Sequence, residues 1–186
     1  MSKVYVLLAE GFEESEAVVP IDLLRRARVE VITVSITEEP LVLSSHGIPV
    51  TADTVLSKVE DTADALFLPG GLKGTNNLKA SEAVAEFIRR HLEADRYMTA
   101  ICAAPTVYGE MGLLQGKKAT CYPGHEDKLL GAEWTGAVQT VTVDGKFITS
   151  RGMGTSLDFG LKLIEVLVSR EKAQEIANQV LHPRAL

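Results

Sequence analysis

The chain has 186 residues, 46% of them hydrophobic and 24% charged, which is typical of one compact globular domain over residues 1–186. Its net charge is −6 and no basic run occurs, so nucleic acid is not indicated as a partner. The N-terminus enters an apolar strand without the apolar region of a signal peptide, and no apolar run approaches the roughly 18 residues of a membrane span. We therefore expect a cytoplasmic protein that binds no membrane.

Short apolar runs alternate with amphipathic runs along the first half of the chain. Val4–Ala9 is entirely apolar, as expected of a parallel strand covered on both faces. Glu13–Ala27 has apolar residues at helical spacing, and Pro20 is expected to bend this helix after its first turn. The pattern then predicts a strand at Val29–Ser35, a hairpin of Leu41–Ser44 and Ile48–Thr51, a strand at Asp64–Leu68 and a helix at Glu82–Leu92 with Val84, Phe87, Ile88 and Leu92 inside.

The second half continues the alternation. A strand at Met98–Ile101 leads to Cys102, and Asp144-Gly145 is a strong hairpin signal. Thr155 and Asp158 have the spacing of a capping box, and Ser169 is a good N-cap. These signals predict a hairpin of Val138–Val143 and Phe147–Ser150, a helix from Thr155 to about Val168, and a C-terminal appendage helix at about Arg170–Leu181.

Strands alternating with helices predict an α/β fold, in which a mainly parallel sheet lies between two layers of helices and small hairpins are appended. Ligands of such sheets bind beyond the carboxyl ends of the strands. Three segments lie at such ends: Glu10-Gly11, Gly70-Gly71 and Cys102. We expect them to converge on one site.

Cys102 lies between a buried strand and a helix opened by small residues, which is the layout of a nucleophile elbow. Amides at a helix N-terminus favour the thiolate, the reactive form. The alternative is a buried cysteine that serves only packing, which is the more natural interpretation of Cys121. Phosphate-loop, dinucleotide and metal-ligand spacings do not occur in the sequence, so we expect no cofactor and no metal.

Four segments in order carry a family resemblance. The chain resembles the ThiJ/PfpI superfamily, in the branch of the parkinsonism-associated protein DJ-one, which has a class I glutamine-amidotransferase-like fold. The similarity extends from about Lys3 to about Val168. The segments are Ala9–Glu16, Leu68–Gly71, Ala100–Thr106 and Thr149–Ser156.

The resemblance implies a flavodoxin-like sandwich, a homodimer and a reactive Cys102 paired with Glu16. It further implies an oxyanion pocket formed by the backbone around Gly70, Gly71 and Ala103. Since a thiolate and a carboxylate side by side repel each other, one of the pair must hold a proton. We expect Glu16 to be the protonated partner and to donate a hydrogen bond to the sulfur, with the two groups titrating as a unit.

The chain departs from the family in the loop that follows the next strand. Many relatives place a histidine beside the cysteine, whereas Tyr122 aligns here and His125 comes three residues later. A Cys-His-acid triad therefore lacks its base. In the family, the hairpin that carries His46 reaches toward the partner subunit's pocket, so a basic residue at this position would help to hold an anionic product. Tyr122, His125 and His46 are thus auxiliary candidates.

The leading hypothesis is a cofactor-independent cysteine enzyme of the glyoxalase III or deglycase type. Its substrates are 2-oxoaldehydes such as methylglyoxal, or their glycated adducts. One alternative is an oxidative-stress sensor or chaperone in which Cys102 oxidises to a sulfinate. An intracellular cysteine peptidase is the third interpretation, disfavoured by the missing base.

Overall fold

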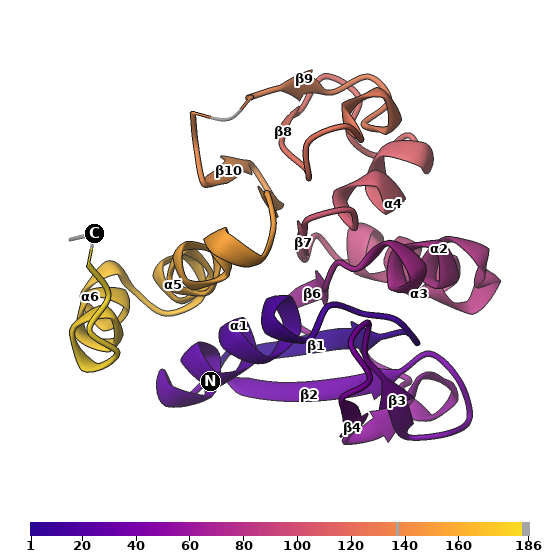
Figure 1. The fold of residues 1–186 in the computed structure, drawn as a ribbon, viewed down its shortest axis with the longest axis horizontal. Helices are drawn as coiled ribbons and strands as arrows, with labels where there is room; N and C mark the ends of the chain where they lie inside the picture. The colour runs from indigo at the N-terminus through magenta and orange to yellow at the C-terminus, as the bar shows by residue number, and fades with distance from the viewer. Residues whose placement is uncertain (137, 184–186) are drawn as a thin grey trace.

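A seven-stranded sheet forms the centre of the molecule. The computed structural model describes residues 1–136 and 138–183. The strand order in the sheet is β10-β11-β7-β6-β1-β2-β5 (Figure 1). The strands are β1 (Lys3–Leu8), β2 (Glu30–Ser35), β5 (Thr54–Val55), β6 (Ala65–Leu68), β7 (Tyr97–Ile101), β10 (Val141–Asp144) and β11 (Phe147–Ser150).

All strand pairs of this sheet are parallel except β10 with β11. The chain leaves β1 to form β2 on one side and returns to form β6 on the other, so the strand order reverses at β1. Beside such a reversal the loops separate and leave a crevice at the carboxyl ends of the strands. The segments after β1, β6 and β7 all meet there.

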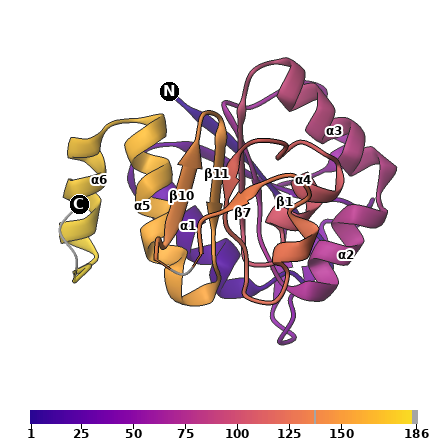
Figure 2. The same ribbon diagram turned by 90° about the horizontal axis from the view of Figure 1, so that it is seen from above.

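Helices cover both faces of the sheet (Figures 1 and 2). One layer contains α1 (Glu14–Arg26), α5 (Ser156–Leu167) and α6 (Arg170–Gln179), and the other contains α2 (Leu72–Ala80), α3 (Glu82–Glu93) and α4 (Pro105–Glu110). Each strand supplies side chains alternately to the two layers, because successive residues of a strand point to opposite faces. The α/β sandwich predicted from the sequence is confirmed.

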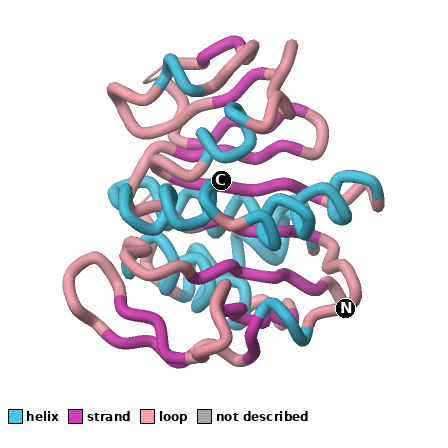
Figure 3. Tube along the Cα trace, turned by 90° about the vertical axis from the view of Figure 1, so that its right-hand side faces the viewer, coloured by secondary structure: helices cyan, strands magenta, loops and turns pink. Residues whose placement is uncertain are grey.

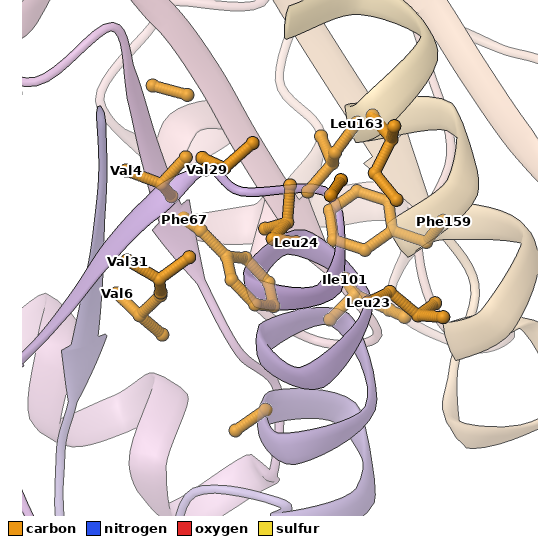
Figure 4. Packing of buried hydrophobic residues seen from close by; sticks show 14 of the residues in the cluster. Val4, Val6, Leu23, Leu24, Val29, Val31, Phe67, Ile101, Phe159 and Leu163 are labelled. Carbon is orange, nitrogen blue, oxygen red and sulfur yellow. The ribbon is translucent and has the colours of Figure 1, made fainter. Parts of the chain in front are cut away.

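The core under α1 and α5 shows how this layer is held together (Figure 4). Val4, Val6 and Phe67 from the sheet are fully buried with Leu24 and Phe159 from the two helices. The rings of Phe67 and Phe159 have centroids 5.2 Å apart at an interplanar angle of 55°, a tilted packing that aromatic pairs favour. α1 runs without interruption through Pro20, which is itself buried.

The strands run across Figure 3 one above another, and two small two-stranded sheets lie outside the main one. The predicted hairpin is present as β3 (Leu41–Leu43) and β4 (Pro49–Thr51). It is anchored beside the end of β1, where the Gly11 amide donates to the Leu43 carbonyl at 2.8 Å. The other pair, β8 (Lys118–Ala119) with β9 (Glu133–Trp134), was not predicted from the sequence, nor was β5.

α2 is an element that the sequence analysis missed. Its residues include one glycine and two asparagines, which have low helix propensity. Gly71 is the N-cap of this helix, and its carbonyl accepts the first helical hydrogen bond from the Thr75 amide at 2.8 Å. The C-terminal helix ends at Gln179 rather than Leu181, and β10 starts at Val141 rather than Val138.

The predicted capping box of α5 is wrong. Thr155 precedes the helix but makes no capping hydrogen bond to it. Its hydroxyl lies 2.7 Å from the Ser150 hydroxyl and 2.9 Å from the Gly152 carbonyl, so it stabilises the preceding loop. Ser169, by contrast, caps α6 as predicted and accepts from the Lys172 amide at 3.1 Å.

The inner face of α3 also differs from the prediction. Leu92 is 38% exposed, while His91 is completely buried. The His91 Nε2 atom accepts from the Ala63 amide at 3.1 Å, and Nδ1 lies 2.8 Å from the Phe87 carbonyl. Because both nitrogens have backbone partners, the polar ring of His91 is accommodated in the core of this layer.

Candidate active site

Cys102 lies at a sharp turn directly after β7. It has φ = +64°, an uncommon conformation for a residue other than glycine. Two backbone bonds hold the turn: the Cys102 amide donates to Ser150 at 3.1 Å, and the Tyr122 amide donates to the Cys102 carbonyl at 2.7 Å. The geometry is that of the nucleophile elbow expected from the sequence.

Glu16 reaches the same place from the first turn of α1 and is only 1% exposed. Gly70 shows how closely acid and thiol approach. A Cβ atom added to Gly70 would lie 2.2 Å from the Glu16 Oε2 atom and 2.5 Å from the Cys102 Cβ atom. The site therefore has room for Glu16 and Cys102 side by side only because residue 70 has no side chain.

The two glycines after β6 serve different purposes. Gly71 has φ = +88°, which favours glycine, and an added Cβ would lie 2.4 Å from the Gly11 carbonyl oxygen. Gly70 has no positive φ and is required by space alone. The backbone amides of Gly71 and Ala103 hydrogen-bond to the Cys102 sulfur and act to lower its pKa, whereas the backbone of Gly70 acts on Glu16.

Burial dominates the protonation of the pair. It raises the pKa of Glu16 to about 7, with a further increase from the Glu13 carboxylate, while Cys102, Gly70 and Met153 act in the opposite direction. Burial and the neighbouring Glu16 also raise the pKa of the Cys102 thiol to about 12. Since both pKa values are raised, the pair holds one shared proton and one negative charge over the range between them.

The surroundings of one oxygen of the acid favour a proton on Glu16. Glu16 Oε2 is buried and lacks a hydrogen bond of normal geometry among the described residues. A bare carboxylate oxygen in that position is costly, whereas a protonated one donates to the sulfur. We assign the negative charge to the thiolate, which receives two amides, because an uncharged Glu16 then becomes a hydrogen-bond donor.

Tyr122 lies near the Glu16 carboxyl, on the other side of Gly152. A Cβ atom on Gly152 would be 3.3 Å from the Tyr122 Cδ2 atom and 3.7 Å from the Glu16 Oε1 atom, so Gly152 separates the two side chains. A cavity of about 310 Å³ opens beside Tyr122 and Gly152; it is lined by Tyr122, Pro123 and residues 151–155, and neither Cys102 nor Glu16 belongs to its lining. A larger cavity of about 600 Å³ lies by the β3–β4 hairpin, and its lining includes Glu10 but neither Cys102 nor Glu16.

The histidines have their contacts away from the sulfur. His125 packs beside Tyr122, with ring centroids 6.3 Å apart, and His46 is exposed with Nδ1 2.9 Å from the Glu14 Oε1 atom. His91 is bonded within the core, and the His182 ring is 3.1 Å from Asp158. None of these contacts of the four histidines involves the Cys102 sulfur.

One group of side chains has the spacing of metal ligands. Ligand atoms of Glu13, Glu14 and His46 lie within 4.8 Å of one another. Both carboxylates already have partners, because Glu13 accepts from the Glu16 amide and Glu14 pairs with His46. We therefore do not assign a metal to this cluster.

The family model for the DJ-1/PfpI family matches residues 2–166. The chain belongs to the DJ-1/PfpI family. It is 39% identical over 177 residues to the protein dj-1beta of Drosophila melanogaster, with 95% of each chain covered. It is 30% identical to a Caenorhabditis elegans protein named glutathione-independent glyoxalase DJR-1.2, covering all of this chain and 96% of that one. It spans less than half the length of two Arabidopsis thaliana DJ-1 homologues, 41% of one and 46% of the other.

Solved structures agree with this assignment. A cysteine-to-alanine mutant of a DJ-1 superfamily protein from Salmonella typhimurium superposes with a TM-score of 0.94 at 37% identity, covering 99% of this chain and all of that one. The oxidized DJ-1 of Toxoplasma gondii gives 0.92 at 38% identity with the same coverage. In the described part of the chain, helices long and apolar enough to cross a membrane are absent.

The structure adds residues to the site that the sequence analysis did not single out. Gly152 and Met153 face the Glu16 carboxyl, and Glu13 caps the helix that carries it. Gly152 and Met153 lie in the Thr149–Ser156 segment, so its motif was the available signal. Glu13 gave only the signal of an acidic helix start, which is common in any helix.

Proposed function

We propose that this protein is a cofactor-independent cysteine enzyme of the glyoxalase III or deglycase type. It acts on 2-oxoaldehydes such as methylglyoxal, or on their adducts with amines and thiols. The observation that carries the proposal is the Gly70 contact, which leaves Glu16 and Cys102 in one buried pocket. The Caenorhabditis elegans relative is named a glutathione-independent glyoxalase, and this name supports the proposed reaction class.

The proposed reaction uses the two side chains and the backbone amides in sequence. The Cys102 thiolate attacks the aldehyde carbon, and the amides of Gly71 and Ala103 move their hydrogen bonds from sulfur to the new oxyanion. Glu16 protonates that oxyanion, and the product is a hemithioacetal. The Glu16 carboxylate then takes the proton from this carbon and gives it to the ketone oxygen, which forms an enediol. It next takes the proton of the first hydroxyl group and delivers it to the neighbouring carbon.

The result is a thioester of a 2-hydroxy acid, in which the first carbon has been oxidised and the second reduced. Water attacks the thioester carbonyl, the C–S bond breaks, and the hydroxy acid leaves as the thiol is restored. Each proposed step uses groups of this chain and water. The cavity beside Tyr122 and Gly152 is proposed as the place of the substrate's remaining carbons.

Methylglyoxal turnover without glutathione tests the proposal. Wild type should release lactate, and Cys102→Ser and Glu16→Gln should each lose at least about a hundredfold in kcat/KM. Cys121→Ser is the matched control, since this thiol is buried and its sulfur donates to the Tyr122 carbonyl. Normal turnover by Cys102→Ser would exclude the mechanism.

A redox sensor is the second candidate, favoured by a specific observation. The Cys102 sulfur is only partly buried and receives amides and a carboxyl that equally suit a sulfinate. The related Toxoplasma gondii structure is described as oxidized. Two equivalents of peroxide would convert the thiolate to a sulfinate and release two waters. Intact mass should show two added oxygens on Cys102, whereas oxidation spread over methionines and Cys121 would contradict the sensor hypothesis.

Assembly and location remain proposals. We propose a homodimer in the cytoplasm, with His46 of one subunit near the pocket of the other and His125 as a further auxiliary group. Sedimentation analysis checks the dimer, and a monomer at micromolar concentration would refute it. Peptide hydrolysis is disfavoured because Tyr122 stands where many relatives place the histidine base.

A further inference from the structure

Glu13 connects the two halves of the candidate active site. It is the N-cap of α1, and its Oε2 atom accepts from the Glu16 amide at 2.6 Å. Its own amide donates to the Gly70 carbonyl at 2.9 Å, and its carbonyl accepts from the Ala17 amide at 3.1 Å. The same residue therefore bonds to the residue that supplies the acid and to the glycine that makes room for it.

The loop around Glu13 is packed tightly against the Gly70–Gly71 turn. A Cβ atom on Gly71 would lie 2.7 Å from the Glu13 amide nitrogen and 2.9 Å from the Phe12 carbonyl carbon. The turn and the start of α1 thus have little freedom to move apart. Displacement of Glu13 would shift the Glu16 carboxyl and the Gly71 amide together.

Glu13 is also a charge next to the acid. Its carboxylate and Cys102 are the charged or titratable side chains among the main influences on the pKa of Glu16, and Glu13 raises it. Glu14 and His46 have ligand atoms within 4.8 Å of the Glu13 carboxylate. Further titratable groups around the site include Tyr122 and Arg151 at the cavity, and Lys73 from α2, which packs on Gly11 and pairs with Glu10 at 2.6 Å.

We infer that Glu13 is a positioning residue, which fixes Glu16 against the Gly70–Gly71 turn and uses its own charge to keep Glu16 a proton donor. The inference rests on the Cys102–Glu16 pair of the proposed function. It goes beyond the ordinary contribution of an acidic residue to a helix N-terminus, because Glu14 occupies the same turn without these contacts. Glu14 is instead bonded to His46.

The test is the pH profile of Cys102 alkylation by iodoacetamide. The reaction is carried out in the presence of EDTA, and the alkylated peptide is quantified by mass spectrometry. Glu13→Gln keeps an oxygen that accepts from the Glu16 amide but removes the charge. Without that charge the pair gives up its first proton more readily, so it becomes a monoanion at lower pH. The acidic limb of the alkylation profile should move to lower pH by roughly half a unit.

Two further variants make the result specific. Glu14→Gln removes one charge from the same helical turn and should leave the midpoint of the profile unchanged. Glu13→Asp keeps both the charge and a good cap, and should restore the wild-type midpoint. Equal shifts in Glu13→Gln and Glu14→Gln, or no shift in either, would overturn the inference.

The alkylation assay is independent of turnover. If wild type does not convert methylglyoxal but Glu13→Gln shifts the profile, the proposed enzyme activity fails and the positioning role stands. If methylglyoxal is converted and the profile does not respond to Glu13→Gln, the positioning role fails alone.

Discussion

Glu16 is the residue around which the chemistry of this site is organised. It is a carboxyl with 1% exposure whose pKa is raised to about 7 by burial. Keeping such a group buried is unfavourable once it would ionise, and folded proteins commonly retain that cost at functional sites. The raised pKa has consequences for both stability and activity.

Glu16→Gln should remove a pH dependence from the free energy of unfolding. In wild type the unfolded carboxyl ionises above 4.5 while the folded one stays protonated to about 7, so stability falls as pH rises through that window. The loss amounts to about 3 kcal/mol by pH 7, from the difference between those two pKa values. Urea unfolding should show that the free energy of unfolding of Glu16→Gln rises relative to that of wild type between pH 4.5 and 7. A difference between the two proteins that is the same at every pH would contradict the explanation.

At the scale of elements, the turn between β6 and α2 controls the site. Gly71 combines a left-handed conformation with backbone atoms of the β1–α1 loop at its missing Cβ. The turn also directs one of the two amides at the Cys102 sulfur. The function of this segment therefore depends on glycine for steric reasons that a strand prediction does not contain.

Gly71→Ala should destabilise the protein by about 3 kcal/mol and impair turnover, because conformational strain and a clash with backbone add together. Gly47→Ala is its matched control: Gly47 also has a positive φ, +80°, but no atom within 4 Å of an added Cβ. It should cost only about 1 kcal/mol. Chemical denaturation of the two variants measures the difference, and equal costs would remove the steric argument.

The contact of α1 with α5 depends on another glycine. A Cβ on Gly160 would lie 2.6 Å from the Leu23 Cδ1 atom and 3.1 Å from the Pro20 Cα atom. Leu23 is completely buried, so it has little space into which to move. The absence of a side chain lets the two helices approach closely over the core shown in Figure 4.

Gly160→Ala should therefore be destabilising by about 1–2 kcal/mol, because overpacking exceeds the helix propensity gained by alanine. Gly154→Ala, at a position with open space around it, should change stability by less than about 0.5 kcal/mol. Thermal unfolding compares the two. A more stable Gly160→Ala would show that the helices separate easily.

At the scale of the whole molecule, the layer opposite α1 contains a titratable group in its core. Burial lowers the pKa of His91 below its ordinary value of 6.5, and the nearby Arg90 and Arg96 contribute in the same direction while Asp61 opposes them. The neutral ring bonds to the backbone before β6, and its centroid lies 4.5 Å from that of Phe87. α3 and the sheet are thus joined through an uncharged histidine.

Acidification should weaken this layer. The unfolded histidine takes up a proton below pH 6.5 while the folded one resists it, so the stabilising contribution is present above 6.5 and is lost as pH falls toward the lower folded pKa. His91→Gln should have a lower free energy of unfolding than wild type at pH 7.5. Between pH 7 and 5, however, its free energy of unfolding should fall less than that of wild type. Ionisation of Glu16 changes the free energy of unfolding in the opposite direction over this pH range. The prediction is therefore checked by the difference in free energy of unfolding between His91→Gln and wild type at each pH.

The sequence by itself determined the fold class and most strands, because buried parallel strands and amphipathic helices leave periodic patterns that need no partner to recognise. It also identified Cys102 and the segments that meet it, since a strand, a cysteine and small residues form a local pattern. The short elements α2, β5, β8 and β9 left no such pattern. The strands among them pair with partners elsewhere in the sequence, β5 with β2 and β8 with β9.

Which polar side chains are buried, and which residues they contact, depends on the tertiary structure. Glu16 and Glu14 are neighbours on one acidic helix start, yet one is enclosed with Cys102 and the other pairs with His46. His91 lies in the core, where two backbone groups bond to its ring. The burial and the electrostatic surroundings of a residue depend on what the fold packs around it. The pKa values, the role inferred for Glu13 and the steric need for glycine at position 70 therefore follow from the three-dimensional structure and not from the sequence pattern.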